Sequence, residues 1–306
     1  MELLLGQALA LFTALCFAQN SLIYAYVGRI VSSSTTAHIR LWIAVPAILL
    51  IHLLFLGTLF PHGVSLQSWI FMGISGVLGF CIADLFIFSA LVKIGARQTM
   101  VIMTTSPLFS TIFAYVIEKE VITYFQAFGM FVTLLGVALV ILVDKNKKET
   151  TGNKNIETGV LFAFLGAITQ ALAMVLAKKG MGSSVHPISA NVIRLLFGLI
   201  SLVIFTLIRK SFFSDFKLFI NKSQIKVLLL IVAAALVGPV LGIILNLWAL
   251  SIAPVGIVTT LSQMTPVLLL PLEKYILKRY VSPLASIGTI IAVVGTVLLF
   301  ISPNPF

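Results

Sequence analysis

The feature that most constrains this chain is a series of apolar runs, each close to 20 residues long and separated by short polar connections. A helix of about 20 apolar residues spans the hydrocarbon core of a bilayer. Hydrophobic residues make up 60% of the sequence and charged residues only 9%, a composition that excludes a soluble domain. We therefore expect an all-α integral membrane protein with ten transmembrane helices. The predicted helices are residues 4–27, 36–56, 67–91, 98–117, 125–143, 158–177, 187–208, 225–247, 255–273 and 282–302.

The second half of the chain repeats the first. Residues 89–108 align without gaps on residues 248–267, which defines an offset of 159. Each copy holds five predicted helices, and because five is odd the two copies cross the membrane in opposite directions. A 5+5 inverted repeat of this kind is typical of secondary transporters, whose site lies near the midplane between the copies. The matched residues are Gly79 and Gly238, Pro107 and Pro266, Gly129 and Gly288, Gly136 and Gly295, and, at an offset of 154, Arg40 and Arg194.

The longest hydrophilic interval separates the two copies. We expect residues 1–143 to form the first five-helix repeat, residues 144–157 a solvated linker and residues 158–306 the second repeat. The connections after the first, third, fifth, seventh and ninth helices, with their flanking residues, hold 15 of the 20 Lys and Arg residues. The positive-inside rule places these connections in the cytoplasm and both termini outside. The expected location is the cytoplasmic (inner) membrane, as a multi-pass protein.

Two short motifs recur in both copies. The first copy reads TTSPLFSTIFAYVIEKE and then FGMFVTLLGV, with Pro107, Glu120, Gly129 and Gly136. The second copy reads QMTPVLLLPLEKYILKR and then IGTIIAVVGT, and it departs from the first by carrying Arg279 where the glutamate is expected. Over essentially the whole chain this pattern resembles the EamA family of the drug/metabolite transporter (DMT) superfamily.

The resemblance implies a ten-helix fold that moves small organic metabolites or drugs by alternating access, and it favours export over uptake. It implies no single substrate, because members of the family carry amino acids, nucleobases, drugs and other metabolites. Members commonly keep both termini in the cytoplasm, so the resemblance and the loop charges disagree on orientation. We follow the loop charges, because GTLFPHGVSL has no Lys or Arg whereas its repeat partner RKSFFSDFKLFINKSQIK has several.

Asp84 is the only acid well inside a predicted helix. Because an ionisable group in a membrane faces a partner or water, Asp84 indicates either an ion pair or a site for a substrate amine or a proton. Arg40 is the expected partner, since at ~1.5 Å per helical residue both groups lie roughly 6–10 Å from the cytoplasmic face. The second copy has Ile243 at the matched position, so the carboxylate is not required by the repeated fold. We favour the pair slightly, with proton exchange at Asp84 as a subsidiary hypothesis.

Arg40 and Arg194 occupy matched positions in the two copies and by inversion approach opposite faces of the membrane. Three roles are open for these arginines. They are gates on alternate sides, they attract an anionic group of the substrate, or they reach outward to lipid phosphates.

The first predicted helix carries a mildly polar stripe. Thr13, Cys16, Asn20 and Tyr24 share one helical face, with Gln19 beside it. The stripe faces either a cavity or a neighbouring helix, because small and polar residues also join membrane helices. Tyr24, near the end of the helix, is interpreted mainly as an anchor at the membrane interface.

The fourth and ninth predicted helices carry prolines at matched positions beside hydroxyl and amide side chains. Breaks at corresponding places in two halves indicate a transport site, and we expect a central cavity lined by helices 1, 3, 4, 6, 8 and 9. The candidate substrate-binding or gating residues are Asp84, Arg40, Arg194, Asn20, Gln19, Thr104, Pro107, Gln263, Pro266, Asn246 and Trp248.

The closest alternative function is a lipid or polyprenyl-phosphate flippase, because basic helix ends would recruit phosphate. A remote alternative is an intramembrane enzyme, since GISG at residues 73–76 matches the short motif of rhomboid-like serine proteases. A serine nucleophile needs a base, and no later predicted helix contains histidine. We expect no enzyme activity, no catalytic residue, no cofactor and no metal site. The expected partners are a small-molecule substrate, membrane lipids and, if transport is coupled, protons; we expect no nucleic acid, and a monomer or homodimer.

Overall fold

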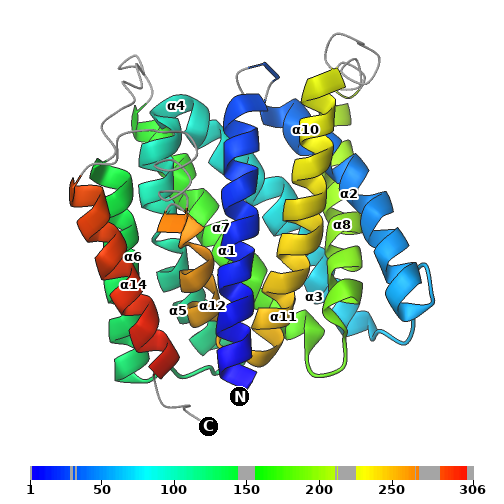
Figure 1. Ribbon diagram of the computed structural model, residues 1–306. Helices are drawn as coiled ribbons and strands as arrows, with labels where there is room; N and C mark the ends of the chain where they lie inside the picture. The colour runs from blue at the N-terminus through cyan, green and yellow to red at the C-terminus, as the bar shows by residue number, and fades with distance from the viewer. Residues whose placement is uncertain are drawn as a thin grey trace.

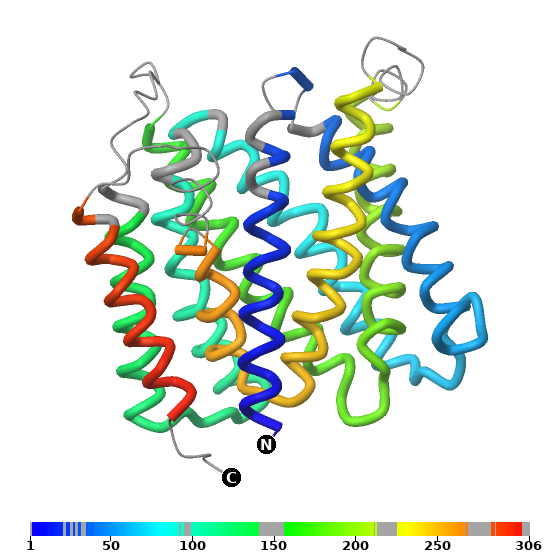
Figure 2. Tube along the Cα trace, in the orientation of Figure 1, coloured from blue at the N-terminus to red at the C-terminus, as the bar shows by residue number. Residues whose placement is uncertain are grey.

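The computed structural model describes residues 2–27, 30–31, 33–143, 156–210, 212, 225–265, 267–268 and 283–301. Within these ranges the secondary structure is helical and contains no strand. Figure 1 shows the helices packed side by side between two faces of the molecule, and Figure 2 traces the chain through them. The first and last described helices meet at one face, where Gln7 Nε2 donates a hydrogen bond to the carbonyl oxygen of Leu299 at 2.8 Å.

The first half contains α1 (Glu2–Val27), α2 (Ser33–Leu56), α3 (Leu66–Val77), the π-helix η1 (Leu78–Ala83), α4 (Asp84–Met103), α5 (Ser106–Glu118) and α6 (Tyr124–Val143). The second half contains α7 (Ile156–Met181), α8 (Pro187–Ile208), α10 (Ile225–Ala235), the π-helix η3 (Leu236–Gly242), α11 (Ile243–Ile252), α12 (Val255–Ser262) and α14 (Pro283–Ile301). Most predicted bounds agree with these to within a few residues. The end of the predicted helix 255–273 and the linker residues 144–155 lie outside the described residues.

Hydropathy and length support a multi-pass membrane protein. Among the described residues, seven segments are long and apolar enough to cross a bilayer, and two shorter apolar helices cover Tyr124–Val140 and Ser286–Ile301. Large apolar side chains such as Phe12, Phe55 and Ile112 are exposed on the helices. Such a surface suits lipid, because apolar side chains at this density would be costly in water. The predicted all-α membrane class is therefore confirmed.

The largest local difference from prediction is the connection expected at residues 92–97. The helical backbone of α4 continues through it, from Asp84 to Met103. Ile94 packs near Gly159 at the start of α7, whereas Glu120 pairs with Lys178 near the end of α7, so the chain reverses between these points.

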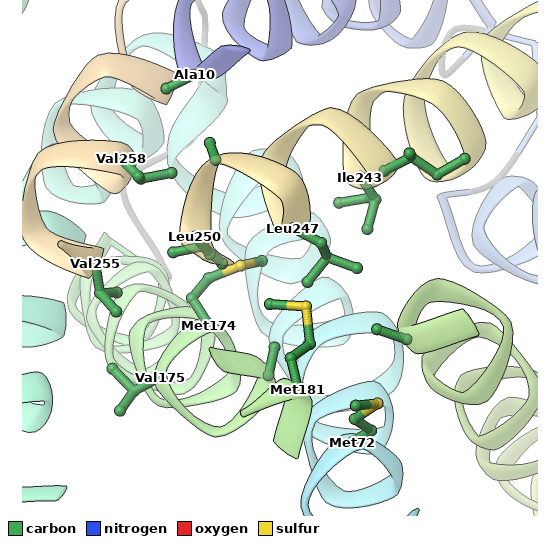
Figure 3. Packing of buried hydrophobic residues seen from close by; sticks show 14 of the residues in the cluster. Ala10, Met72, Met174, Val175, Met181, Ile243, Leu247, Leu250, Val255 and Val258 are labelled. Carbon is green, nitrogen blue, oxygen red and sulfur yellow. The ribbon is translucent and has the colours of Figure 1, made fainter. Parts of the chain in front are cut away.

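The first helix of each half packs mainly against the other half. In the first half α1 packs against η3, α11 and α12 of the second half, whereas α7 of the second half packs against α3, η1, α4 and α5 of the first. Figure 3 shows the resulting core, in which Ala10 of α1 and Met72 of α3 lie around the α7 and α11 side chains that include Met174 and Leu247. Each half therefore buries part of its apolar surface against the other.

The last helices of the two halves, α6 and α14, form the most extensive helix pair, seen side by side in Figure 1. A Cβ atom at Gly136 would lie 2.6 Å from the carbonyl oxygen of Gly288, and one at Gly129 would lie 3.3 Å from that of Gly295. These are the glycines that the offset of 159 pairs, and the contacts are reciprocal. Small residues let membrane helices approach closely and pack by dispersion.

Both π-helices lie at positions that the same offset of 159 matches, since Leu78–Ala83 corresponds to residues 237–242 within η3. In η3, Pro239 lacks a backbone donor and loosens the helical ladder. Asn191 of α8 compensates, because its Nδ2 donates to the carbonyl oxygen of Pro239 at 2.9 Å and to that of Val240 at 3.3 Å. Such π-helical turns frequently occur at functional sites.

Candidate functional site

Two adjoining cavities lie between the halves. The first has a volume of about 180 Å³ and the second about 210 Å³, and both are lined by Phe17, Gln170 and Met174. Because they share these three walls, we treat them as two compartments of one central cavity. The first is called the hydroxyl compartment and is lined in addition by Met100, Thr104, Ser106, Val137, Asn246, Thr259, Ser262, Gln263 and Thr265. The second is called the arginine compartment and is lined in addition by Asn20, Tyr24, Arg40, Gly79, Phe80, Asp84, Arg194, Gly238, Pro239 and Ile243.

An ion pair joins Arg40 and Asp84 in the arginine compartment, between Nη2 of the guanidinium and Oδ2 of the carboxylate. The two side chains are 9% and 17% exposed, so the pair is largely withdrawn from solvent. The guanidinium also lies over the rings of Tyr24 and Phe88, 5.9 and 5.7 Å from their centroids. The pair neutralises both charges, so Asp84 is not a free carboxylate in this conformation.

Arg194 lies in the same compartment without such a partner. Its side chain is only 1% exposed, and its Nε and Nη1 atoms make no hydrogen bond with the described residues. The Phe80 ring, 5.4 Å from the guanidinium carbon, supplies a cation–π contact. Two glycines of the first half let α8 approach this compartment closely. The backbone of Arg194 lies against Gly76, and its Nη2 lies near Gly79.

The two arginines were expected near opposite faces of the membrane. They do enter from helices of opposite direction, yet their side chains line one compartment. The two side chains meet because α2 and α8, which carry them, pack against each other. A role for either in reaching lipid phosphates is not what this geometry favours, because both are buried.

The hydroxyl compartment is built where two helices break. The turn at Thr104 and Thr105 separates α4 from α5, and the turn at Gln263 and Met264 follows α12. Thr104 Oγ1 donates to the carbonyl oxygen of Val101 at 2.6 Å, so the hydroxyl satisfies a backbone acceptor beside the break. The described residues of this compartment carry hydroxyl, amide and apolar groups and no charge.

Asn246 adds an amide to this wall. Its Nδ2 donates to Ser262 Oγ at 2.9 Å, which links α11 to the end of α12. Its Oδ1 has no hydrogen-bond partner among the described residues. An amide oxygen left free beside a cavity is available to a donor on a bound solute.

Matched residues of the two halves line the cavity together. Both compartments contain such matched pairs, and the pairs include glycines as well as charged residues. The matched pairs in the lining are Gly79 and Gly238, Phe80 and Pro239, Asp84 and Ile243, Met100 and Thr259, Thr104 and Gln263, Ser106 and Thr265, and, at the offset of 154, Arg40 and Arg194.

Some predicted site residues lie elsewhere. Gln19 is exposed next to the polar stripe, and Trp248 is 44% exposed with its ring 6.3 Å from that of His186. Both project away from the cavity because their neighbours Asn20 and Asn246 occupy the inward face of the same helices. Pro107 is buried at the start of α5 instead of kinking a continuous helix, and Pro266 lies outside the described residues.

Other lining residues were missed or interpreted differently. Tyr24, expected mainly at the membrane interface, lines the arginine compartment, whereas Thr13 of the same stripe donates to the carbonyl oxygen of Gly242 at 3.4 Å and serves helix packing. Gln170 lines both compartments. The cavity also takes Arg40 from α2, Val137 from α6 and Arg194 from α8. These are the second, fifth and seventh predicted helices, which were not expected to line it.

A second polar cluster lies at the face where α1 begins, which is called the terminal face. Lys178 Nζ lies 2.5 Å from Glu120 Oε1 and donates to the carbonyl oxygen of Ala253 at 2.7 Å. Glu120 Oε2 accepts a hydrogen bond from the backbone N–H of Val255 at 2.8 Å, and so caps α12. This cluster, called the latch, joins the connection after α5 to the end of α7 and to the start of α12.

The EamA-like transporter family matches this chain over residues 4–142 and again over residues 157–301. The chain belongs to that family. Among curated proteins, an uncharacterized transporter, YyaM of Bacillus subtilis (strain 168), is 31% identical over 145 residues, which is 46% of this chain and 44% of the relative. The match thus spans less than half of the relative's length. A solved structure described as "Crystal structure of protein" has a TM-score of 0.70 at 19% identity, over 96% of this chain and 95% of that one, which shows a shared fold.

Proposed function

We propose that this EamA family member is a secondary transporter that exports small organic metabolites or drugs across the cytoplasmic membrane by alternating access. One observation carries the proposal: matched residues of both halves line a single central cavity. A site on the symmetry axis between two repeats is reached from one side or the other when the halves rock. The latch supplies a closed side, because it ties the halves together at the terminal face.

The arrangement behind this mechanism is a ten-helix 5+5 inverted repeat, with residues 1–143 and 158–306 as its copies. Reciprocal contacts support it, since Gly129 meets Gly295 and Gly136 meets Gly288 across α6 and α14. A two-fold relation exchanges these two contacts. The packing of α1 against the second half and of α7 against the first half is reciprocal in the same way.

For orientation we retain the loop charges, which place both termini outside and the latch on the external side. The cavity is formed within one chain, so a monomer suffices for transport and a homodimer would be two such units. A cysteine introduced as Ser214→Cys, in a chain with Cys16 and Cys81 replaced by alanine, tests the orientation. Labelling of intact cells with an impermeant maleimide would contradict it; labelling only after permeabilisation is expected.

Proton coupling at Asp84 is a subsidiary part of the proposal. Its ion pair with Arg40 would have to open for the carboxyl group to take a proton or a substrate amine. A flippase is less well supported, because compartments of about 180 and 210 Å³ suit a small solute better than a polyprenyl chain. The serine of the GISG motif, Ser75, donates its hydroxyl to the carbonyl oxygen of Ala173 at 2.5 Å, which is a helix-packing role.

Reconstituted transport tests the proposal directly. Purified protein in proteoliposomes is screened with labelled small metabolites and drugs, with and without an imposed proton gradient. We expect saturable movement of at least one solute that is lost when Gly238→Ala places a methyl group against the Asn20 amide in the lining of the arginine compartment. Failure to move any solute, by protein that keeps its thermal unfolding transition, would contradict the proposed function.

A further inference from the structure

The arginine compartment contains a cation that nothing in the described structure neutralises. Its ionisable lining residues, apart from the phenol of Tyr24, are Arg40, Asp84 and Arg194. The first two form an ion pair, and among the described residues no carboxylate pairs with Arg194. Because a guanidinium stays protonated, this compartment keeps one net positive charge.

A buried arginine without a counter-charge is costly. Removing a charge from water is repaid only when a partner and hydrogen bonds replace the hydration shell. The Phe80 ring offsets part of that cost, but Nε and Nη1 keep unsatisfied donors. Packing alone does not require the charge, since an apolar or amide side chain would fill the same space. The uncompensated charge, on a residue that lines the compartment, therefore indicates a group that arrives from outside the chain.

From this we infer that the transported solute carries a carboxylate and that Arg194 binds it in the arginine compartment, with the rest of the solute uncharged. The inference rests on the proposed transport function and names the chemical class of its substrate. A carboxylate fits because it supplies the missing negative charge and accepts charge-assisted hydrogen bonds from a guanidinium. The side-chain amides of Asn20 and Gln170 line the same wall and offer further donors.

The neighbouring hydroxyl compartment suits the uncharged remainder. It shares Phe17, Gln170 and Met174 with the arginine compartment, so a solute anchored at Arg194 extends past Gln170 into it. Its walls combine hydroxyls and amides with apolar surface and contain no described charged residue. A second charge on the solute would be desolvated there without a partner. A solute ammonium would find only Asp84, which Arg40 already holds.

Matched ligands test the inference without any mutation. Thermal unfolding of the purified protein in detergent is measured with size-graded triplets, such as benzoate, benzamide and benzylamine, or 4-methylpentanoate with its amide and amine, at constant ionic strength. A ligand that binds only the folded state raises the melting temperature with concentration. We expect stabilisation by carboxylates and not by the corresponding amides or amines. If no carboxylate stabilises the protein, or if amides act equally, the inference is wrong.

Variants then locate the site. Arg194→Gln is expected to weaken carboxylate binding at least tenfold, while Arg209→Gln, at the exposed residue that follows the same helix, leaves it unchanged. Without ligand, Arg194→Gln should melt no lower than the wild type, because an unpaired buried charge is lost; a purely structural arginine would give a lower melting temperature. Equal carboxylate binding by Arg194→Gln and wild type would overturn the inference. If Arg194→Gln does not fold, Arg194→Lys, which keeps the charge and loses the fork, should bind carboxylates with reduced affinity.

Transport assays distinguish the carboxylate inference from the proposed transport function. In proteoliposomes, movement of neutral or cationic solutes that is unaffected by Arg194→Gln would overturn the anion inference and leave the transport function standing. Stabilisation by zwitterionic amino acids but not by monocarboxylates would likewise overturn it. Carboxylate binding with no movement of any solute would contradict the proposed transport function while leaving the site intact.

Discussion

Lys178 and Glu120 form an ion pair that ties the first half of the chain to the second, with Nζ and Oε1 2.5 Å apart. Through Ala253 and Val255 the same two side chains hold the connection between α11 and α12. Gly6 packs against Ala253, so the latch lies at the face where α1 begins. A rocking motion that opens the cavity toward this face must break these contacts.

Breaking the latch should therefore favour opening at this face. We expect Lys178→Met to speed maleimide labelling of Val258→Cys, a fully buried position on α12, about tenfold, which corresponds to ~1.4 kcal/mol. The background is a chain with Cys16 and Cys81 replaced by alanine. Lys179→Met is the matched control, because the Lys179 ammonium instead lies 5.2 Å from the ring of Phe71. Equal labelling of the two variants would rule out the latch as a gate.

The ion pair of Arg40 and Asp84 leads to a second prediction. Asp84→Asn leaves the buried guanidinium without its counter-charge and should destabilise the protein by roughly 3–5 kcal/mol. The double variant Arg40→Gln/Asp84→Asn should recover most of that loss in thermal unfolding. Additive losses would show that the two residues act independently. An unchanged pH dependence of transport in the double variant would exclude Asp84 as the coupling site.

Two matched glycines should differ in their tolerance of a methyl group. A Cβ at Gly238 would overlap the side-chain amide of Asn20, whereas one at Gly79 would meet its nearest neighbour, Nη2 of Arg194, at 3.4 Å. We expect Gly238→Ala to cost about 1–3 kcal/mol by overpacking and Gly79→Ala to be nearly neutral. Thermal unfolding of both variants measures this. Similar losses would show that the space beside Asn20 is not set by Gly238.

The interface of α6 and α14 gives a further pair of variants. Gly136→Ala places a methyl group against the backbone of Ala292 and Gly288, which cannot move without shifting a helix. Gly129→Ala instead meets mainly the flexible side chain of Leu299, at 3.2 Å. We expect a loss of roughly 1–3 kcal/mol for the first and a much smaller change for the second. A larger loss for Gly129→Ala would contradict the interface described.

Stability should fall slightly in acid through His186, which lies before α8 and outside the membrane-spanning segments. Burial, and then the charge of His52, hold the pKa of His186 below its ordinary value. Its Nδ1 accepts a hydrogen bond from the N–H of Ile188 at 3.2 Å, and protonation removes that acceptor. Because the folded pKa is the lower one, this contribution is present above the unfolded pKa of about 6.5 and is lost as the pH falls through the folded pKa.

Melting temperatures between pH 7.5 and 5 measure this contribution. His186→Asn should show a smaller acid loss than the wild type, because asparagine caps helices well and does not titrate. An identical acid loss in the two proteins would place the titration elsewhere.

The sequence by itself determined the membrane class, most of the helix bounds and the positions that the two offsets match. These follow from local chemistry, because a bilayer demands long apolar helices with internally satisfied backbones. It also favoured Arg40 as the partner of Asp84, since the depth of a residue along a helix can be counted.

Only the tertiary structure decided which faces meet. It brought Arg40 and Arg194 into one compartment, turned Gln19 and Trp248 outward, and drew Gln170 and Tyr24 into the lining. In a membrane, both the lipid and the neighbouring helices accept apolar side chains, so hydropathy does not distinguish the two surfaces of a helix. The packing of α1 against the second half, and of α7 against the first half, decides which face of each of these helices points inward.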